Sequence, residues 1–446
     1  MRESHTVQKS IFDFYSQHEF STHLEKMSRL LDEYPTIIPL IENDLIDEDC
    51  QMVGRKGLSV ESVLRCLLLK KISGASYDKL AFHLSDSSSF RAFARIDNKA
   101  SPGKSALQAN IRRITPQTLQ AVFEVLSTKE FKAGNLRLDA LRIDSTVVKS
   151  NIAPPLDSQL LNDGVRVLSR YLAKCNDRAG VKIRFKDYRK IARSLSAQIF
   201  YSRKKTEKID LYGGLLPIVK QVIKQVDRAT TRVRLHAASA EAQVWLEEIE
   251  HYCELTKKVI HQTEQRVINE VKVPSSEKIV SLFEPHTDII IKGSRDVDYG
   301  HKINLASDQR GIITGLMIEE GNPSDVERYL PMLQEHEALY GCLPGAVVAD
   351  GGYASQDNVV EGRALGIQRV VFHKKRGITL RAMGVQEKTY EKLKNFRAGI
   401  EGNISELKRV FGAGKALWKG HDGFMADVWA SVISYNLVRL VRLNPG

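Results

Sequence analysis

The chain has 446 residues, 42% hydrophobic and 27% charged, so it is long enough for two or three domains with their own cores. Its formal net charge of +12 favours a polyanionic partner. No run of 18 apolar residues occurs and residues 1–14 lack the apolar core of a signal peptide, so we expect neither a membrane span nor export. The cysteines are far apart and have no zinc-like spacing, which predicts free thiols in a reducing cytoplasm. They are Cys50, Cys66, Cys175, Cys253 and Cys342.

The first 130 residues have helical periodicity. The stretch LSVESVLRCLLLKKISG ends at Gly74, short helices follow to about residue 96, and a further helix is predicted over about 116–130. Short helices with outward cations resemble a helix-turn-helix DNA-binding module, and the alternative is a small helical bundle with a solvated basic face. The cations expected to point outward are Lys70, Lys71, Arg91, Arg95, Arg112 and Arg113.

The remainder alternates between strands and helices around a long helical insertion. The stretch LRLDALRIDSTVV has the period of two that is typical of a strand. Further strands are predicted at 301–307, 312–320, 346–350 and 368–373, and helices at a capping box over 324–327, at about 356–365 and over most of the last hundred residues. We therefore predict an α/β domain with a mixed five-stranded sheet over 131–156 and 285–446, a helical insertion over 157–284, and a helical domain over 1–130.

Three acidic residues stand at notable places in this scheme. Asp144 lies within an apolar strand, where an unpaired carboxylate is costly, and the alternative is a turn cap or a pair with Arg142 or Lys149. Asp350 ends an apolar strand before Gly351 and Gly352, which let a ligand approach the backbone, although Asp-Gly-Gly is also a plain turn.

The third acid, Glu401, lies in the helical stretch RAGIEGNISELK. Arg397 and Lys408 stand four residues before it and seven after it, so the three side chains share one face of a helix. The alternative is a surface ion pair between Glu401 and Arg397. Glu406 points about 140° away around the helix, so it cannot share a metal site with Glu401.

Asp144, Asp350 and Glu401, here called the acidic triad, would meet at one end of the predicted sheet. Convergent carboxylates repel one another unless hard cations hold them, and Mg²⁺ accepts carboxylate oxygens. Two such ions would activate water or a 3′-hydroxyl and stabilise the leaving oxygen of a phosphodiester. Arg397 and Lys408 would then neutralise the phosphates of the strand that is cut.

These stretches resemble the DDE-type transposases of bacterial insertion sequences, in particular the ISNCY-type group and its relatives. The resemblance rests on LRIDSTVV, SNIAPPLDSQLLNDGVRVL, SLFEPHTDIIIKGSRDVDYGHKINLA, GNPSD, VVADGGYAS and RAGIEGNISELKR. It implies a ribonuclease-H-like catalytic domain with the acidic triad as catalytic and metal-binding residues. Related elements carry a Tyr, Arg, Glu, Lys signature, which Arg397, Glu401 and Lys408 match. Lys394 takes the tyrosine position, with Tyr390 one turn earlier.

The resemblance implies an enzyme that binds the terminal inverted repeats of its own element, cleaves the ends with two Mg²⁺ ions (Mn²⁺ substituting) and joins the 3′ ends to target DNA. Its partner would be double-stranded DNA, bound by a homodimer, in the cytoplasm at the nucleoid and away from membranes. Lys394 would contribute a phosphate contact, and Trp418 would stack on a base or pack in the core. The alternatives are a catalytically silent DNA-binding protein derived from a transposase and a metal-dependent, structure-selective nuclease. The basic runs of the insertion would line a DNA channel or form a solvated surface.

Overall fold

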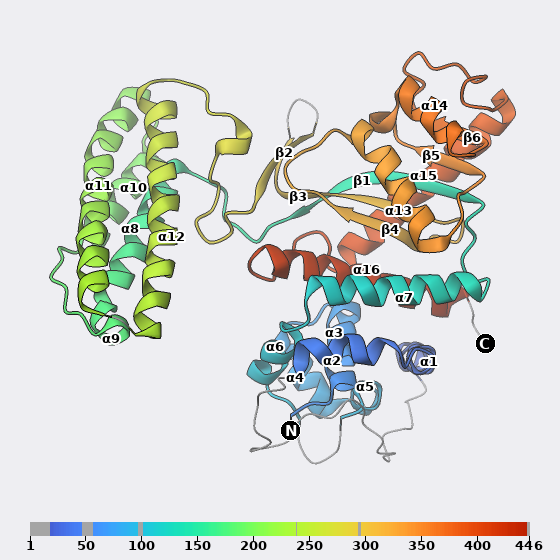
Figure 1. Cartoon of the computed structure of the whole chain (residues 1–446), viewed down its shortest axis with the longest axis horizontal. Helices are drawn as coiled ribbons and strands as arrows, with labels where there is room; N and C mark the ends of the chain where they lie inside the picture. The colour runs from blue at the N-terminus through green and yellow to red at the C-terminus, as the bar shows by residue number, and fades with distance from the viewer. Residues whose placement is uncertain (1–17, 47–56, 97–100, 238, 293–295, 444–446) are drawn as a thin grey trace. The chain divides into compact units, whose positions relative to one another are not determined.

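The computed structural model describes residues 18–46, 57–96, 101–237, 239–292 and 296–443 (Figure 1). The chain forms two compact units, one made of 1–151 with 300–446 and the other of 152–299. Cys50 and the start of the chain, on which two of our expectations rest, lie outside the described residues. The other four cysteines are free thiols.

A mixed sheet is the centre of the first unit. Its strands are β1 (Ala140–Lys149), β3 (Asp296–Ser307), β4 (Ile313–Ile318), β5 (Ala346–Ala349) and β6 (Arg369–Phe372). The sixth strand, β2 (Asp288–Lys292), and the first residues of β3 belong to the second unit by residue number. The order is β2-β3-β1-β5-β6, and β4 also pairs with β3. β1 runs antiparallel to β3 and parallel to β5, and β6 is parallel to β5. A central β1 with antiparallel partners on one side and parallel partners on the other confirms the predicted ribonuclease-H-like fold class, with one strand more than predicted.

Helices cover both faces of this sheet. α15 (Glu387–Arg409) packs against β1, β5 and β6, α13 (Tyr329–Tyr340) packs against β4, and α14 (Gln356–Ala364) against β6. All four residues of β5 are buried, as expected for an inner parallel strand covered on both faces. The predicted capping box before α13 is wrong, because the Ser324 side chain caps no backbone N–H and a 3₁₀ turn (Asp325–Arg328) precedes the helix.

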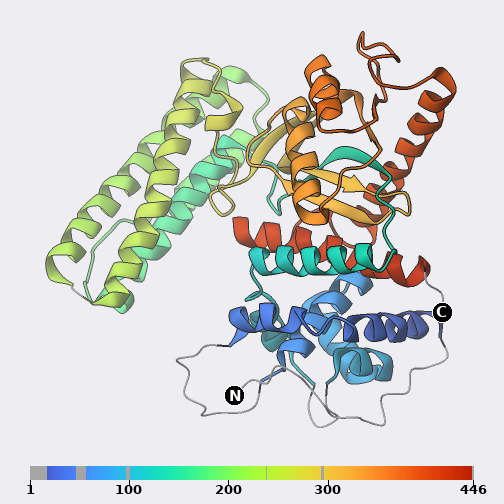
Figure 2. The ribbon, with the colours of Figure 1, turned by 45° about the vertical axis from the view of Figure 1, so that its right-hand side comes forward.

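Among the described residues before β1, the structure has seven helices: α1 (Glu19–Asp32), α2 (Ile37–Leu45), α3 (Val60–Ser73), α4 (Tyr77–Asp86), α5 (Ser88–Ala94), α6 (Lys104–Ile111) and α7 (Pro116–Lys132). α3 ends as predicted at Gly74, whose φ of 63° is the left-handed conformation that glycine adopts most easily. α7 lies beside the terminal helix α16 (His421–Leu443) in both views (Figures 1 and 2). One apolar core runs through these helices and the adjacent sheet face.

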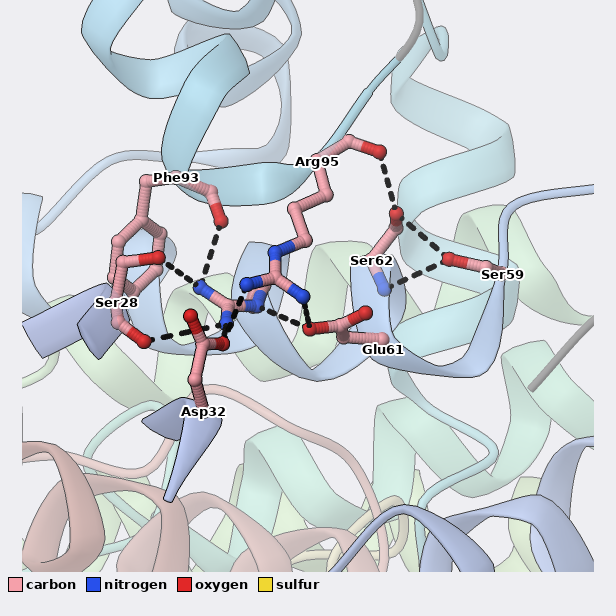
Figure 3. Close-up of polar contacts among 8 residues, drawn as sticks. Ser28, Asp32, Ser59, Glu61, Ser62, Phe93 and Arg95 are labelled. Atoms are coloured by element: carbon pink, nitrogen blue, oxygen red, sulfur yellow. Dashed lines mark hydrogen bonds and ion pairs between the residues drawn. The ribbon is translucent and has the colours of Figure 1, made fainter. Parts of the chain in front are cut away.

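Ion pairs around the buried Arg65 tie the first helices together. Arg65 of α3, 1% exposed, contacts Asp32 of α1 at 2.7 Å and Glu61 at 3.0 Å, and Arg95 contacts the same two acids (Figure 3). Lys71, also on α3, pairs with Asp427 of α16 at 2.6 Å, with both side chains buried.

The expectation of an outward basic face is therefore only partly correct. Lys71 and Arg91 are buried, and Arg95 is held by two carboxylates, so these three cations stabilise the fold. Arg112 and Arg113 are exposed. A single apolar periodicity does not distinguish a cation that faces solvent from one that faces a buried acid on another helix.

The second unit is a helical bundle. It contains α8 (Asp157–Ala173), α9 (Cys175–Ala179), α10 (Arg189–Tyr201), α11 (Lys205–His236) and α12 (Ala240–Thr263), which continues into a π-helical turn (Glu264–Ile268) and a later 3₁₀ turn (Ser275–Glu277). Trp245 is fully buried at its centre and donates its indole N–H to the Tyr171 carbonyl. Asp157, the first residue of α8, is buried and pairs with Arg266 at 2.8 Å.

The terminal helix α16 is long and apolar enough to cross a membrane by length and composition alone. However, 83% of its most apolar window is buried inside the protein. It contacts α1, α3, α7 and α15, which is the position of a core helix.

Candidate active site

The acidic triad gathers around one guanidinium group, that of Arg397. One of its terminal nitrogens lies 2.6 Å from Asp144 Oδ2 and 3.5 Å from Asp350 Oδ1. The other lies 2.8 Å from Glu401 Oε1. Three acids that are far apart in sequence are therefore within reach of a single cation.

Each acid comes from a different part of the sheet domain. Asp144 is in the middle of β1, Asp350 follows the last residue of β5, and Glu401 lies on α15. β1 and β5 are parallel neighbours, so Asp350 emerges beside Asp144 at one end of the sheet. Exposure increases across the set: the side chains of Asp144, Asp350 and Glu401 are 13%, 41% and 64% exposed.

The position of α15 is fixed by a close approach to β1. A Cβ atom on Gly399 would lie 1.9 Å from Nη1 of Arg142, so a side chain there would force this guanidinium to move. The Arg142 guanidinium donates to the Phe396 carbonyl at 3.1 Å and to Ser307 Oγ at 2.9 Å. Because Arg397 and Glu401 flank Gly399 on α15, this contact sets their height above β1.

The two glycines after Asp350 make room for neighbouring protein side chains. A Cβ on Gly351 would lie 2.8 Å from the Lys374 side chain, and one on Gly352 would lie 2.7 Å from Asp325 Oδ2. The Gly-Gly pair thus allows the turn after β5 to pack closely against two polar side chains.

A buried polar network lies on the other face of β1 and supports this turn. Tyr353, which is fully buried, donates to Asn304 Oδ1 at 2.5 Å, and Asn304 donates to Glu319 Oε1 at 2.5 Å. Ser145, the neighbour of Asp144, donates to Asp325 at 3.2 Å. The segments that carry Asp144 and Asp350 are therefore anchored in one network.

Two ion pairs belong to the same network: the buried Lys302 Nζ lies 2.9 Å from Asp325 Oδ1, and Arg328 Nε lies 2.9 Å from Glu319 Oε2. Burial raises the pKa of Tyr353 well above its usual range, and the nearby Asp325 and Asp144 carboxylates act in the same direction. Tyr353 is thus a neutral hydrogen-bond donor at any physiological pH. Sequence reasoning missed this network, although GNPSD and VVADGGYAS contain Asp325 and Tyr353.

The donor set of the triad fits a hard cation. Carboxylate oxygens are the ligands that Mg²⁺ and Mn²⁺ prefer. In this structure the guanidinium of Arg397 supplies the positive charge among the three carboxylates. In the described parts of the chain, no three His, Cys, Asp or Glu side chains are close enough together to form a ready-made metal cage. In this structure the Arg397 guanidinium lies between the three acids and pairs with each of them.

The other predicted contact residues differ in their surroundings. Lys394 is partly exposed and pairs with Glu391 at 3.2 Å, and Lys408 is partly buried near the end of α15. Arg397 itself is 8% exposed and directed at the triad, so in this conformation it does not present its charge to solvent. Glu406, the rival of Glu401, pairs with Arg442 at 2.6 Å.

Trp418, for which the sequence predicts either base stacking or core packing, lies in the apolar core of this structure. Its side chain is 4% exposed and belongs to the core shared by the first helices and α16. The alternative of core packing describes it correctly. A tryptophan between two lysines looks like a nucleic-acid contact in sequence, but its neighbours Ala416 and Phe424 are buried with it.

Comparison with known proteins supplies the family. Residues 13–113 match a family model described as "Transposase domain (DUF772)", and residues 290–437 match one described as "Transposase DDE domain". The second match includes Asp350, Arg397 and Glu401. Asp144 precedes it, separated by the helical unit, and the sheet brings β1 between β3 and β5.

No curated protein and no solved structure gives a significant match. The two family matches lie on either side of β1 and the helical unit, and both describe transposase domains. The chain belongs to the DDE transposases of insertion sequences.

Proposed function

We propose that the protein binds the terminal inverted repeats of its insertion sequence, cleaves the DNA at those ends and joins the 3′ ends to target DNA. The observation that carries this proposal is the convergence of Asp144, Asp350 and Glu401 on one guanidinium. A site that gathers three carboxylates around a cation suits metal-assisted phosphodiester chemistry.

The triad would hold the metal, with Mg²⁺ as the proposed ion, Mn²⁺ as its substitute and two ions per site. When bound, the ions supply activation of the attacking water or 3′-hydroxyl and stabilisation of the leaving oxygen. Asp144 is the most rigid of the three acids because it is the most buried and also accepts the Ser145 backbone N–H at 2.8 Å. The more exposed Asp350 and Glu401 have the freedom to turn toward a ligand.

Arg397, Lys394 and Lys408 would neutralise the DNA phosphates beside the scissile bond. A guanidinium forms bidentate pairs with carboxylate and phosphate alike, so Arg397 can exchange one anion for the other. When DNA binds, one of its phosphates would replace the carboxylates as the partner of Arg397. The acidic triad would then be free to bind metal. Metal loading and DNA binding would then depend on each other.

The remaining parts of the proposal concern the domains and the assembly. The helical domain (1–130) would recognise the element ends, the sheet domain (131–156 with 285–446) would cut and join, and the helical insertion (157–284) would hold DNA. Because two ends must be joined in one reaction, the complex would be a homodimer on double-stranded DNA, in the cytoplasm.

The test is cleavage of duplexes that carry the sequences flanking the coding region, with Mg²⁺ or Mn²⁺, by wild type, Asp350→Asn and Glu406→Gln. Wild type and Glu406→Gln should cut at the ends, because Glu406 faces Arg442 and not the triad. Asp350→Asn should bind the same duplex and not cut it. Binding without cutting by every protein would leave a silent DNA-binding protein, and equal cutting by Asp350→Asn would place the active site elsewhere.

A strand-transfer assay with a supercoiled target distinguishes a transposase from a structure-selective nuclease. A transposase should join pre-cut ends to the target plasmid. A nuclease should release fragments and leave the plasmid unjoined.

A further inference from the structure

A strongly basic groove lies on the helical unit. Its volume is about 1020 Å³, and it lies between the segment 182–186 and the last third of α11. The side chains that line it are Lys182, Ile183, Arg184, Phe185, Lys186, Gln225, Arg228, Ala229 and Arg232. Five of these nine are cations, and none is a carboxylate.

The first wall of the groove comes from an alternating sequence. Lys182, Arg184 and Lys186 are exposed, whereas Ile183 and Phe185 between them are partly buried against the bundle. The apolar residues hold the segment to the bundle, so alternate side chains all point outward. The three cations therefore line one side of the groove.

Two hydrogen bonds fix this segment to α11. The Lys186 backbone N–H donates to Gln225 Oε1 at 2.6 Å, and Gln225 Nε2 donates to the Lys186 carbonyl at 3.3 Å. A side-chain amide that satisfies both backbone groups of one residue makes the non-helical segment part of the bundle wall.

The second wall comes from α11. Arg228 and Arg232 are four residues apart, so their side chains project from the same face of the helix. Both are exposed, while Val226, Ala229 and Val233 on the adjoining face are buried in the bundle core. The groove thus collects cations from a loop and a helix that are about forty residues apart in sequence.

This concentration of like charge has no compensation within the groove. Asp187, the nearest acid in sequence to the first wall, is occupied by Arg189 at 2.6 Å. Five cations around one groove repel one another, which costs stability unless an anion binds there. The groove is also too large for one phosphate ion, and its cations line two walls rather than converging on a point. Both properties fit a polymer.

We propose that this groove binds the phosphate backbone of duplex DNA. The inference rests on the proposed function and gives the helical insertion a role in it: sequence-independent holding of the element end or of the flanking DNA. Contacts of this kind position DNA and carry no base specificity.

The test measures the salt dependence of binding by the full chain. The variant Arg184→Gln/Arg228→Gln/Arg232→Gln removes three groove cations, and Arg193→Gln/Arg203→Gln/Lys204→Gln removes three exposed cations of the same unit outside the groove. Binding to a 40-base-pair duplex of arbitrary sequence is followed by fluorescence anisotropy over a NaCl series. A plot of log K against log[NaCl] has a negative slope, and its magnitude should decrease by about 2 to 3 for the groove variant, because each lost phosphate contact removes about 0.9.

The control variant should keep the wild-type slope. An equal decrease in both variants, or no decrease in the groove variant, would overturn the proposal. A second pair of substitutions, Lys182→Gln with Lys186→Gln, changes only the non-helical segment and should lower the slope by about 1 to 2 even if the helix substitutions impair folding. An unchanged slope there would also refute the inference.

End cleavage by the wild type, measured in parallel, separates this inference from the proposed function. Cleavage together with an unchanged groove slope would refute the groove alone. A reduced slope without any metal-dependent cleavage by the wild type would support the groove and refute the transposase activity.

Discussion

Arg397 and Asp144 form the closest ion pair of the candidate active site, 2.6 Å between Nη2 and Oδ2, with the two side chains only 8% and 13% exposed. The same guanidinium reaches Glu401 at 2.8 Å. A sequence motif that is expected to contact DNA therefore holds the acidic triad together in the DNA-free protein. Arg397 supplies the positive charge that the three carboxylates require.

The substitution Arg397→Gln should lower the stability of the metal-free protein and raise its affinity for metal. The free energy of unfolding should fall by about 1–3 kcal/mol, mainly through the buried pair with Asp144. Asp350 and Glu401 are more exposed and contribute little. Without the competing guanidinium, Mn²⁺ should bind roughly fivefold tighter or better, measured by electron paramagnetic resonance of free Mn²⁺.

Arg409→Gln is the matched control, because Arg409 is an exposed cation on the same helix that contacts only the Ser405 carbonyl in the described structure. It should leave both stability and Mn²⁺ binding unchanged. If Arg397→Gln bound Mn²⁺ no more tightly than wild type, Arg397 would not compete with metal.

Much of the sheet domain was predictable because its local signals agree with the final packing. β1 coincides with a stretch rich in Leu, Ile and Val, β5 is apolar throughout and is followed directly by Asp350, and the order of strands and helices confirmed the fold class. The helical periodicity of residues 397–408 also placed Arg397 and Glu401 on one face of α15.

What could not be predicted depends on contacts between distant segments. Trp418 has a polar neighbourhood in sequence and an apolar one in space, and Lys71 faces Asp427, which is over 350 residues away. The buried bond from Tyr353 to Asn304 links a turn to a strand that precedes it. No local pattern reports such partners, because each side of the contact is an ordinary residue by itself.

Tyr353→Phe should test whether the buried network positions the active site. The ring is retained, but Asn304 Oδ1 loses its donor at 2.5 Å, and an unsatisfied buried acceptor costs about 1–3 kcal/mol. Urea unfolding should show this loss, and end cleavage should slow while the DNA dissociation constant stays constant. Tyr201→Phe, at a side chain that is 79% exposed, should change neither property. Full activity of Tyr353→Phe would mean that the turn holds Asp350 without this bond.

His336 on α13 should make the protein acid-sensitive. Burial lowers the pKa of His336 from 6.5 to about 4, and neither ring nitrogen has a hydrogen-bond partner in the described structure. Because the unfolded chain binds the proton first, stability should be lost as pH falls from 6.5 toward 4, by at most about 3 kcal/mol.

The measurement is urea unfolding of wild type and His336→Phe at pH 7.5 and at pH 5. Phenylalanine keeps the contact with the Tyr340 ring, whose centroid lies 4.7 Å from that of His336. The difference in stability between the two proteins should favour the variant more at pH 5 than at pH 7.5. An equal difference at both values would show that His336 takes up no additional proton on unfolding.

Two glycines on α15 give opposite predictions for the same substitution. Gly399→Ala should destabilise the protein by about 1–3 kcal/mol, because the new methyl group would collide with the Arg142 guanidinium and push the helix away from β1. Gly402 has no atom within 4 Å of its would-be Cβ, so Gly402→Ala should stabilise by about 0.5–1 kcal/mol through helix propensity. Thermal unfolding of both variants measures the two signs.

End cleavage should fall only in Gly399→Ala, since Arg397 and Glu401 move with the helix. If both variants were stabilised, the helix would have room to shift, and its contact with Arg142 would not determine the position of the triad.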